Sequence, residues 1–355
     1  MEDKIKKLQE RMPQEVDAFL TADEKTVLYL TGFDMTDGAL FVMRDEAFLF
    51  VDFRYIEAAR EEARGCSVVM PEKNFFENIN ALIAERGIKT VGFEEDKFTV
   101  SSFEAYKRRI PTVDFVKMGS VITEMAKIKS IEEMELIEHA EHIGDMALAD
   151  TLPLIKPEMT EIDVALELEY HMRKHGASKT SFDTICVSGT ASSRPHGVPR
   201  NVKLERGFLT MDFGCIYKGY SSDMTRTVCL GTPDEEMKKV YNTVLEAQIK
   251  AIEAVHEGAD CGEIDAVARN IINDAGYRGR FGHSLGHSLG IYIHESPRLS
   301  PKAFGEKLCV GHVFSVEPGI YIEGKYGVRI EDVLQIRESG VVNIAKSPKE
   351  LLVLF

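Results

Sequence analysis

Acidic residues in the second half of the chain are spaced so that two of them would meet across a β-hairpin. Residues 209–228 have the pattern of two short strands, with a turn expected between Tyr217 and Lys218. This register places Asp212 directly opposite Asp223, with Cβ atoms about 4.5–5.5 Å apart. Two carboxylates so close repel each other unless divalent cations lie between them, and such a pair can hold two ions about 3.5–4 Å apart. A shift of the turn by one residue would remove this pairing.

A second pair of acids lies near the carboxyl-terminal end. Residues 314–322 and 328–336 are strand-like and flank a turn at Gly324. Glu317 and Glu331 are equidistant from this glycine, so the hairpin opposes them as well. One such pair is also typical of two solvated acids on an exposed hairpin. Two pairs, set among strand-forming apolar neighbours, favour a site for divalent cations.

A glycine-rich segment between the two hairpins carries three histidines, His283, His287 and His294. Imidazoles bind metals or move protons, and the glycines allow close backbone approach. The same segment contains Gly-x-Ser-x-Gly twice, around Ser284 and Ser288, which would nominate a serine hydrolase. We reject this interpretation because such a nucleophile lies between a strand and a helix, whereas strand-forming residues and a proline follow here.

The composition is that of a globular protein of two domains. The chain has 355 residues, 44% hydrophobic and 28% charged, and a formal net charge of −15 without a long basic run, which disfavours nucleic-acid binding. Its six cysteines are scattered, without the spacing of a disulfide framework, and are expected to be reduced. Residues 1–11 lack the apolar core of a signal peptide, and no run is long enough to span a membrane. We therefore expect a cytoplasmic protein without membrane contact.

The periodicity of apolar residues predicts an α/β domain over residues 1–123 and a second domain over 124–355. In the first domain we expect strands at 27–30, 39–43, 47–51 and 90–93 and helices at 55–64 and 75–86. The second domain is expected to open with a capping box at Ser130 and Glu133 and to continue with helices at 161–174, 234–256 and 262–275.

Taken in order, the motifs resemble those of the prolidase and aminopeptidase P family of dinuclear metallopeptidases. The shared stretches are Asp212-Phe213-Gly214, Gly219 to Thr227, Gly286-His287, Ile293-His294-Glu295, Glu317-Pro318-Gly319, Arg329-Ile330-Glu331-Asp332 and Ser193 to Gly197. Tyr29 to Phe33 and Asp52 to Tyr55 look like the creatinase-type amino-terminal domain of that family. The resemblance implies an α/β two-domain chain whose carboxyl-terminal domain has the pita-bread fold, with metals in a central cleft.

The resemblance also implies the roles of single residues. It gives Asp212, Asp223, His287, Glu317 and Glu331 as the metal ligands, with Asp223 and Glu331 bridging two ions. The oxygen-rich set suits Mn²⁺, with Co²⁺ or Zn²⁺ as alternatives. The ions would activate water for attack on an Xaa-Pro bond. Glu317 would carry the proton, and His196 and His294 would stabilise the tetrahedral intermediate or orient the substrate.

The substrate length depends on what meets the carboxyl end of the peptide. Arg298 matches the position of a carboxylate-binding arginine in prolidases, which favours dipeptides, while a merely exposed arginine there would leave aminopeptidase P activity on longer peptides. Arg329 is expected to border the substrate cleft or brace Glu331, and His283 is expected either to contact a metal ligand without binding the metal itself or to pack behind the ligands. Ser288 and Arg194 depart from the residues usual in the family, which could alter the pocket.

Two further expectations follow from the resemblance. A homodimer that binds proline-containing di- or oligopeptides is the expected assembly. A non-catalytic member that uses the fold only to bind a partner is the alternative from another class of function, and the complete ligand set argues against it.

Overall fold

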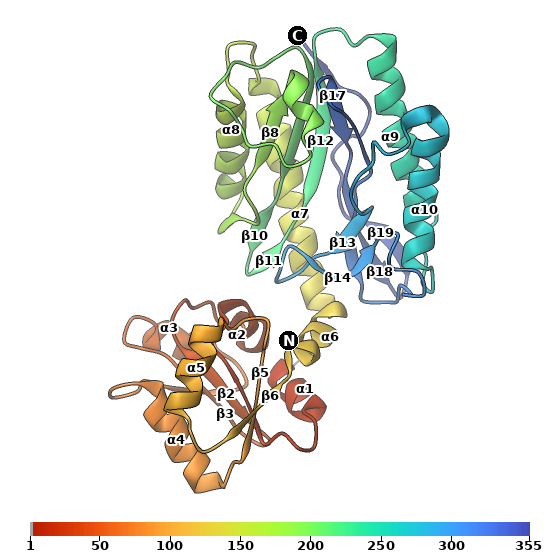
Figure 1. The fold of residues 1–355 in the computed structure, drawn as a ribbon. Coiled ribbons are helices and arrows are strands. Elements are labelled where there is room, and N and C mark those ends of the chain that lie inside the picture. The colour runs from red at the N-terminus through yellow and green to blue at the C-terminus, as the bar shows by residue number, and fades with distance from the viewer. Residues whose placement is uncertain (1–2) are drawn as a thin grey trace. The chain divides into compact units, whose positions relative to one another are not determined.

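The computed structural model describes residues 3–355 and divides the chain into two compact units, Met1–Ala126 (unit 1) and Lys127–Phe355 (unit 2) (Figure 1). Each unit has its own sheets and its own core. In the part of the chain that is described, no helix is both long and apolar enough to cross a membrane.

Unit 1 is built on one mixed sheet of six strands in the order β4-β3-β2-β1-β5-β6. The strands are β1 (Ala18–Thr21), β2 (Ala39–Met43), β3 (Ala47–Phe50), β4 (Ser67–Val69), β5 (Thr90–Phe93) and β6 (Asp114–Lys117). The helices are α1 (Lys4–Arg11), α2 (Glu24–Thr31), α3 (Ile56–Glu62), α4 (Phe75–Arg86), α5 (Val100–Arg109) and α6 (Gly119–Lys127). These bounds confirm the strands predicted at 39–43, 47–51 and 90–93 and the helices predicted at 55–64 and 75–86.

The strand predicted at residues 27–30 is wrong, because these residues lie inside α2. The carboxylate of Asp23 accepts a hydrogen bond from the amide of Thr26, and Gly32 ends the helix with a φ of 76°. The N-cap Asp23 and the left-handed Gly32 enclose a short helix of eight residues whose middle is apolar. The apolar run was therefore the buried face of a helix and not a strand.

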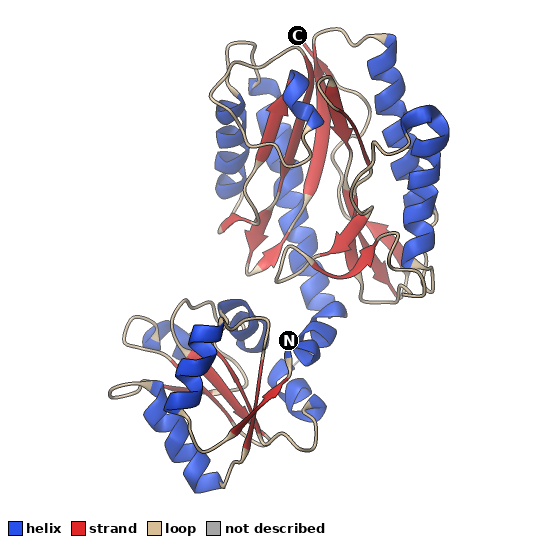
Figure 2. Cartoon of the chain, viewed as in Figure 1, coloured by secondary structure: helices blue, strands red, loops and turns tan. Residues whose placement is uncertain are grey.

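Unit 2 places its strands between two pairs of helices, α7 (Ile131–Thr151) with α8 (Glu161–Lys174) and α9 (Glu235–Glu253) with α10 (Cys261–Ile272), as Figures 1 and 2 show. The strands are β7 (Lys179–Thr180), β8 (Ile185–Ser188), β9 (Gly207–Phe213), β10 (Cys215–Tyr217), β11 (Tyr220–Ser221), β12 (Met224–Leu230), β13 (Gly286–Ser288), β14 (Glu295–Leu299), β15 (Val313–Val316), β16 (Gly319–Ile322), β17 (Tyr326–Arg329), β18 (Asp332–Arg337), β19 (Gly340–Asn343) and β20 (Val353–Leu354). They form sheets in the orders β20-β12-β9-β8, β14-β13-β15-β18-β19, β11-β10-β7 and β16-β17.

The four helices of unit 2 begin near the predicted residues. At α7 the hydroxyl of Ser130 accepts from the amide of Glu133, whose carboxylate accepts from the amide of Ser130, which confirms the capping box. Thr160 and Asp163 form the same arrangement at α8. One apolar core lies against α7 and α8 and another against α9 and α10, so each helix pair is held to the sheets by its buried face.

The register predicted for the first hairpin is wrong by one turn residue. Asp212 pairs with Thr225 and not with Asp223. The reason is the turn itself, where Lys218 and Gly219 have φ values of 45° and 88°, as the two-residue turn of a twisted hairpin requires. Side chains two residues apart on a strand point to the same side, so this register leaves Asp223 diagonal to Asp212 on that side.

The register predicted for the second hairpin is confirmed. Gly319 pairs with Arg329 in β16 and β17, and Val316 pairs with Asp332 in β15 and β18. Glu317 and Glu331 therefore face each other where one strand pair gives way to the next. Both acids lie between the β15–β18 and β16–β17 strand pairs, which fix their positions from either side.

Candidate metal centre

The acids of both hairpins and one histidine converge in unit 2. Asp223 precedes β12, His287 lies in β13, and Glu331 joins β17 to β18. One ligand atom from each of these three buried residues lies within 4.8 Å of the others, a spacing that could hold a metal ion. Glu317 follows β15, and its Oε1 is 3.5 Å from Nε2 of His287, as is Oδ2 of Asp223. The structure thus brings these four predicted ligands together.

The charge of Asp212, on β9, acts on the other acids of the cluster. Burial, followed by Glu331 and then by Asp212, raises the pKa of Asp223 well above its usual value. Burial and then Asp212 raise the pKa of Glu331 to about 8, and burial and then Glu331 raise that of Glu317 well above its usual value. Carboxylates crowded in this way are stable as anions only if cations lie among them.

Single atoms in the site also fit a bound cation. Oδ1 of Asp212 is buried and makes no hydrogen bond, although a buried carboxylate oxygen normally has a partner. Nδ1 of His287 lies 3.2 Å from the carbonyl oxygen of Ser288 and donates to it. The lone pair of His287 is therefore on Nε2, which faces two acids, as expected for a metal-binding imidazole held by its other nitrogen.

The neutral state of His287 is consistent with that role. Burial, followed by His294, lowers the pKa of His287 to about 3. A neutral imidazole cannot neutralise the acids around it, so the charge that balances them must come from elsewhere. Four carboxylates and one imidazole form a hard, oxygen-rich donor set for divalent ions.

Arg329, 3% exposed, is the main cation that contacts the acids. Its Nη2 donates to Oδ2 of Asp212 at 2.5 Å, its Nε to the hydroxyl of Thr225 at 3.0 Å, and its Nη1 to the hydroxyl of Tyr321 at 2.8 Å. The hydroxyl of Thr225 in turn donates to Oε2 of Glu331 at 2.7 Å. Arg329 therefore braces Asp212 directly and Glu331 through Thr225.

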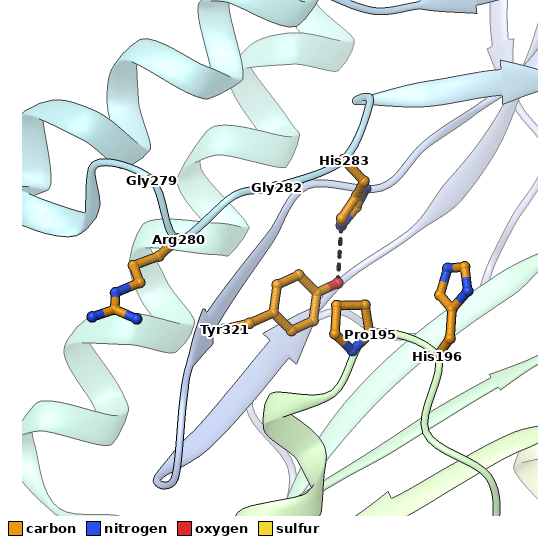
Figure 3. Close-up of a pocket in the computed structure, with 7 residues that line it drawn as sticks. All are labelled: Pro195, His196, Gly279, Arg280, Gly282, His283 and Tyr321. Carbon is orange, nitrogen blue, oxygen red and sulfur yellow. Dashed lines mark hydrogen bonds between the residues drawn. The ribbon is translucent and has the colours of Figure 1, made fainter.

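A pocket of about 450 Å³ borders the acids and is lined by Pro195, His196, Gly279, Arg280, Gly282, His283 and Tyr321 (Figure 3). Nδ1 of His283 donates to the carbonyl oxygen of Ser284 at 2.8 Å, so its Nε2 accepts from the hydroxyl of Tyr321 at 3.0 Å. Nδ1 of His283 also lies 4.0 Å from Oε2 of Glu317. The structure thus places His283 in the pocket wall, beside a predicted ligand, with its pKa lowered to about 4 by burial and then by Arg329.

The remaining predicted site residues lie on exposed parts of the same region. His196 is exposed, and Figure 3 shows its ring at one side of the pocket. The ring centroid of His294 is 4.4 Å from that of His287. Arg298 is the antiparallel partner of His287, and cross-strand partners point to the same side of a sheet. Arg298 is also among the charges that lower the pKa values of His287 and His294, after burial.

The unusual residue Ser288 faces away from the acids. Its hydroxyl donates to the carbonyl oxygen of Val313 at 2.7 Å and accepts from Nζ of Lys129 at 3.1 Å. Nζ of Lys129 also pairs with Glu295 at 2.7 Å, and both of these side chains are less than one-tenth exposed. β13 is followed by β14 and not by a helix, so Ser288 does not lie at the strand-to-helix turn of a serine-hydrolase nucleophile.

Three residues near the site, Glu141, Tyr321 and Lys129, were not predicted from the sequence. Glu141, fully buried in α7, accepts from the amide of Asp223 at 3.2 Å, and its Oε1 has no hydrogen-bond partner. Its position four residues after the buried Ile137 was a usable signal, because an acid on the apolar face of a helix needs a partner. For Tyr321 and Lys129 no such signal exists, because their partners are distant in sequence.

A buried cluster of acids around one imidazole, on sheets covered by two helix pairs, defines a metal-dependent hydrolase. The family model "Metallopeptidase family M24" matches residues 135–338, and "Creatinase/Prolidase N-terminal domain" matches residues 4–127. The chain belongs to metallopeptidase family M24. It is therefore a metal-dependent peptidase with a creatinase-type amino-terminal domain and a pita-bread catalytic domain, which confirms the fold class and the enzyme class.

Known proteins are similar along the whole chain. An Xaa-Pro dipeptidase of Pyrococcus horikoshii is 38% identical over 99% of each chain. Among solved structures, an Xaa-Pro dipeptidase from Bacillus anthracis has a TM-score of 0.94 at 39% identity and covers 99% of each chain. An X-Pro aminopeptidase from Thermotoga maritima has a TM-score of 0.92 at 34% identity, over 98% of this chain and 100% of that one.

Proposed function

We propose that this peptidase hydrolyses Xaa-Pro dipeptides, with two divalent ions held by Asp212, Asp223, His287, Glu317 and Glu331. The observation that carries the proposal is the placement of Arg298 opposite His287 on the neighbouring strand, which sets a guanidinium beside the candidate metal centre. The similarity to Xaa-Pro dipeptidases over the full length supports the same substrate class.

The acids and His287 would hold the ions, and Mn²⁺ fits them best because four of the five ligands are carboxylates. When bound, the ions supply Lewis acidity, which polarises the scissile carbonyl and makes water acidic enough to react near neutral pH. Arg329 fixes the orientation of the Asp212 carboxylate, and Thr225 that of the Glu331 carboxylate. These contacts preserve the geometry of the centre while substrate enters and leaves.

Glu317 is the proposed carrier of the proton. Its side chain is 16% exposed, more than those of Asp212 and Asp223, and it lies beside His283 in the pocket wall. The hydroxyl of Ser315 donates to Oε1 at 3.3 Å and leaves Oε2 on the side of His283. Glu317 can therefore take a proton from the attacking water and pass it to the leaving proline nitrogen.

His196 and His294 are the proposed donors to the reacting carbonyl. Both are exposed, so substrate can reach them. Burial and then Arg298 lower the pKa of His294, so this imidazole is neutral at pH 7 and can donate from one ring nitrogen without adding charge. Donors placed where negative charge develops stabilise the transition state more than the ground state.

Arg298 is the proposed anchor for the substrate carboxylate. A guanidinium pairs with a carboxylate through two parallel hydrogen bonds, and a dipeptide places its only carboxylate one residue from the scissile bond. A longer peptide has an amide at that position and gains nothing from the arginine. An anchor of this kind therefore selects dipeptides.

The test is release of proline from Ala-Pro, with and without Mn²⁺, beside cleavage of a longer Xaa-Pro peptide. Rapid Mn²⁺-dependent turnover of the dipeptide alone is the expected result. Removal of only the first residue of the longer peptide would assign aminopeptidase P activity, which the similarity to the Thermotoga maritima structure makes the second candidate. No turnover of either peptide by protein that holds two metal ions per chain would overturn the Xaa-Pro assignment.

Three finer proposals complete this picture. The physiological ion is Mn²⁺, and elemental analysis of chains purified without added metal tests it. The enzyme is a homodimer, which sedimentation equilibrium tests. It works in the cytoplasm, which fractionation of the source cells tests. Folded chains that hold no stoichiometric metal and cleave neither peptide would favour the alternative of a non-catalytic binding module.

A further inference from the structure

A second cluster of potential metal ligands lies in unit 2, away from the catalytic acids. It consists of Asp150 near the end of α7, His171 in the last turn of α8 and His175 directly after α8. One ligand atom of each residue lies within 4.8 Å of the others. Asp150 is nine residues after Glu141, which is about 13 Å along the helix, so the cluster is separate from the catalytic centre.

His171 is buried without a hydrogen bond. It is 7% exposed, and neither of its ring nitrogens has a partner with hydrogen-bond geometry. Its Nδ1 is 3.3 Å from Oδ2 of Asp150, and its Nε2 is 3.6 Å from Oε2 of Glu167. A buried polar side chain normally satisfies its donors and acceptors, so an unpartnered imidazole aimed at two carboxylates requires an explanation.

One of the two separations around Asp150 matches that of a tetrahedral metal site. Bonds of about 2.0–2.1 Å from a zinc ion to nitrogen or oxygen place neighbouring ligand atoms about 3.3 Å apart. Oδ2 of Asp150 is 3.3 Å from Nδ1 of His171, and it forms a hydrogen bond of 2.9 Å with Nε2 of His175, which a bound ion would replace. Small movements of three side chains would bring these atoms around one ion.

Glu167 has the position of an orienting partner. A histidine that binds a metal through one ring nitrogen usually donates from the other to a carboxylate. If Nδ1 of His171 binds the ion, its Nε2 faces Glu167, one helical turn earlier in α8. His171 and His175 are themselves four residues apart, a spacing that sets two imidazoles on one side of a helical turn.

We propose that Asp150, His171 and His175 bind one divalent transition-metal ion, best matched by Zn²⁺, with Glu167 orienting His171 and water completing the coordination. Two imidazoles and one carboxylate suit a borderline ion better than the hard ions favoured by the catalytic acids. The side chains of Asp150 and His175 are 43% and 24% exposed, so the ion can exchange with solvent. Bound there, it ties the end of α7 to the end of α8.

The competing explanation is a protonated His171 held between Asp150 and Glu167 without metal. The two explanations differ in the number of ions that the chain binds. They can be separated although the catalytic centre also binds Zn²⁺, because a substitution in the second cluster removes one ion and leaves the catalytic ligands intact.

The experiment is equilibrium dialysis of the metal-free full-length chain against Zn²⁺, followed by elemental analysis. His171→Ala and His175→Ala should each bind one Zn²⁺ per chain fewer than the wild type. His256→Ala, at an exposed histidine far along the sequence, should bind the same number as the wild type. Mn²⁺-dependent peptidase activity shows that each variant is folded, and it should be unchanged in all three.

Equal Zn²⁺ counts in the wild type, His175→Ala and His256→Ala would overturn the proposal. If His171→Ala does not fold, Asp150→Asn takes its place, because this change keeps the side-chain shape and removes the charge that a cation needs. A loss of one Zn²⁺ in Asp150→Asn and His175→Ala alike supports the site independently of the buried residue. The count does not depend on which peptide the enzyme cleaves, so failure of the Xaa-Pro assignment would leave this test unaffected.

Discussion

Arg329 pairs with Asp212 at 2.5 Å, and both side chains are almost buried. The same guanidinium reaches Tyr321 and Thr225, so one arginine connects a proposed metal ligand with the wall of the pocket. Of the two roles expected for it, Arg329 borders the pocket through Tyr321 and reaches Glu331 through Thr225. With all three nitrogens engaged, Arg329 is a positioning residue for the metal centre.

Arg329→Lys should therefore impair catalysis more than stability of the fold. Lysine keeps the charge but cannot make the same set of hydrogen bonds, so the Asp212 carboxylate loses its fixed orientation. Loss of a residue that orients a metal ligand typically costs 10–100-fold in metal affinity or activity. We expect kcat/KM for Ala-Pro to fall by about that factor, with weaker Mn²⁺ binding in a metal titration.

The control for this change is Arg278→Lys, at an exposed arginine. It should keep kcat/KM within about twofold of the wild type, because surface substitutions have small effects. An Arg329→Lys enzyme with unchanged Mn²⁺ affinity and unchanged kcat/KM would contradict the positioning role.

Arg298→Ala tests how substrate length is selected. Removing a guanidinium that pairs with a carboxylate should raise KM for Ala-Pro about 10–100-fold, which corresponds to roughly 1.5–3 kcal/mol for a charged hydrogen bond. Ala-Pro-amide has no carboxylate, so its KM should change little. Arg298→Lys should recover part of the affinity through its charge.

The comparison of the two substrates decides the interpretation. Equal increases in KM for Ala-Pro and for its amide would mean that Arg298 shapes the site without binding the carboxylate. A parallel fall in kcat for both would point to an effect on the metal centre through His287, its partner on the neighbouring strand.

The buried pair of Lys129 and Glu295 should show strong coupling in a double-mutant cycle. Lys129→Met leaves the Glu295 carboxylate buried without its cation, which should cost about 3–5 kcal/mol in the free energy of unfolding. Adding Glu295→Gln removes the unpaired charge and should restore at least half of that loss. Urea unfolding of the wild type, both single variants and the double variant measures the coupling.

Additive effects of the two changes would contradict a direct interaction between these side chains. Ser288, whose hydroxyl also contacts Lys129, provides a control variant, Ser288→Ala. It removes the hydroxyl that contacts Nζ of Lys129 but leaves the ion pair, so it should cost only about 1 kcal/mol.

The sequence predicted those parts of the site that depend on short spacings. The pairing of Glu317 with Glu331 was predicted correctly because a glycine marks the turn. Gly324 has a φ of 74°, a conformation that glycine adopts readily. Asp212 and Asp223 were predicted with the wrong partners, because the turn at Lys218 and Gly219 is centred one residue later than predicted and Asp212 therefore pairs two residues further along, with Thr225. The resemblance to a family still identified the same acids, since it depends on their order and not on their register.

Other features lie beyond what spacing can show. The hydrogen bond from the amide of Asp223 to Glu141 joins residues 82 positions apart, and that from Arg329 to Asp212 joins residues 117 apart. Such contacts follow from the packing of whole sheets and helices. The apolar run at residues 27–30 was assigned wrongly for a local reason. Periodicity does not distinguish a short buried helix from a strand, so the length of the run and the capping residues on either side must decide.

Glu94 should make the stability of the protein depend on pH in unit 1, far along the sequence from the metal ligands. It is 1% exposed and accepts from the hydroxyls of Thr21 and Thr26 at 2.6 and 2.8 Å. Burial, against these two hydrogen bonds, raises its pKa from 4.5 to about 7. Between these pH values the folded chain binds more protons than the unfolded chain, so the free energy of unfolding falls as pH rises.

The contribution of Glu94 is therefore fully present below pH 4.5 and is lost as pH rises through 7, a change of about 3 kcal/mol. Glu94→Gln mimics the protonated acid, so it should match the wild type in urea unfolding at about pH 4 and exceed it at pH 8 by up to this amount. Glu85→Gln, at an exposed carboxylate, should follow the wild type at both pH values. The comparison within each pH cancels effects of pH on the metal centre, which all three proteins share. A Glu94→Gln variant that is less stable than the wild type at pH 8 would show that the buried carboxylate is held as a stabilised anion, and the assigned direction of its pKa shift would be wrong.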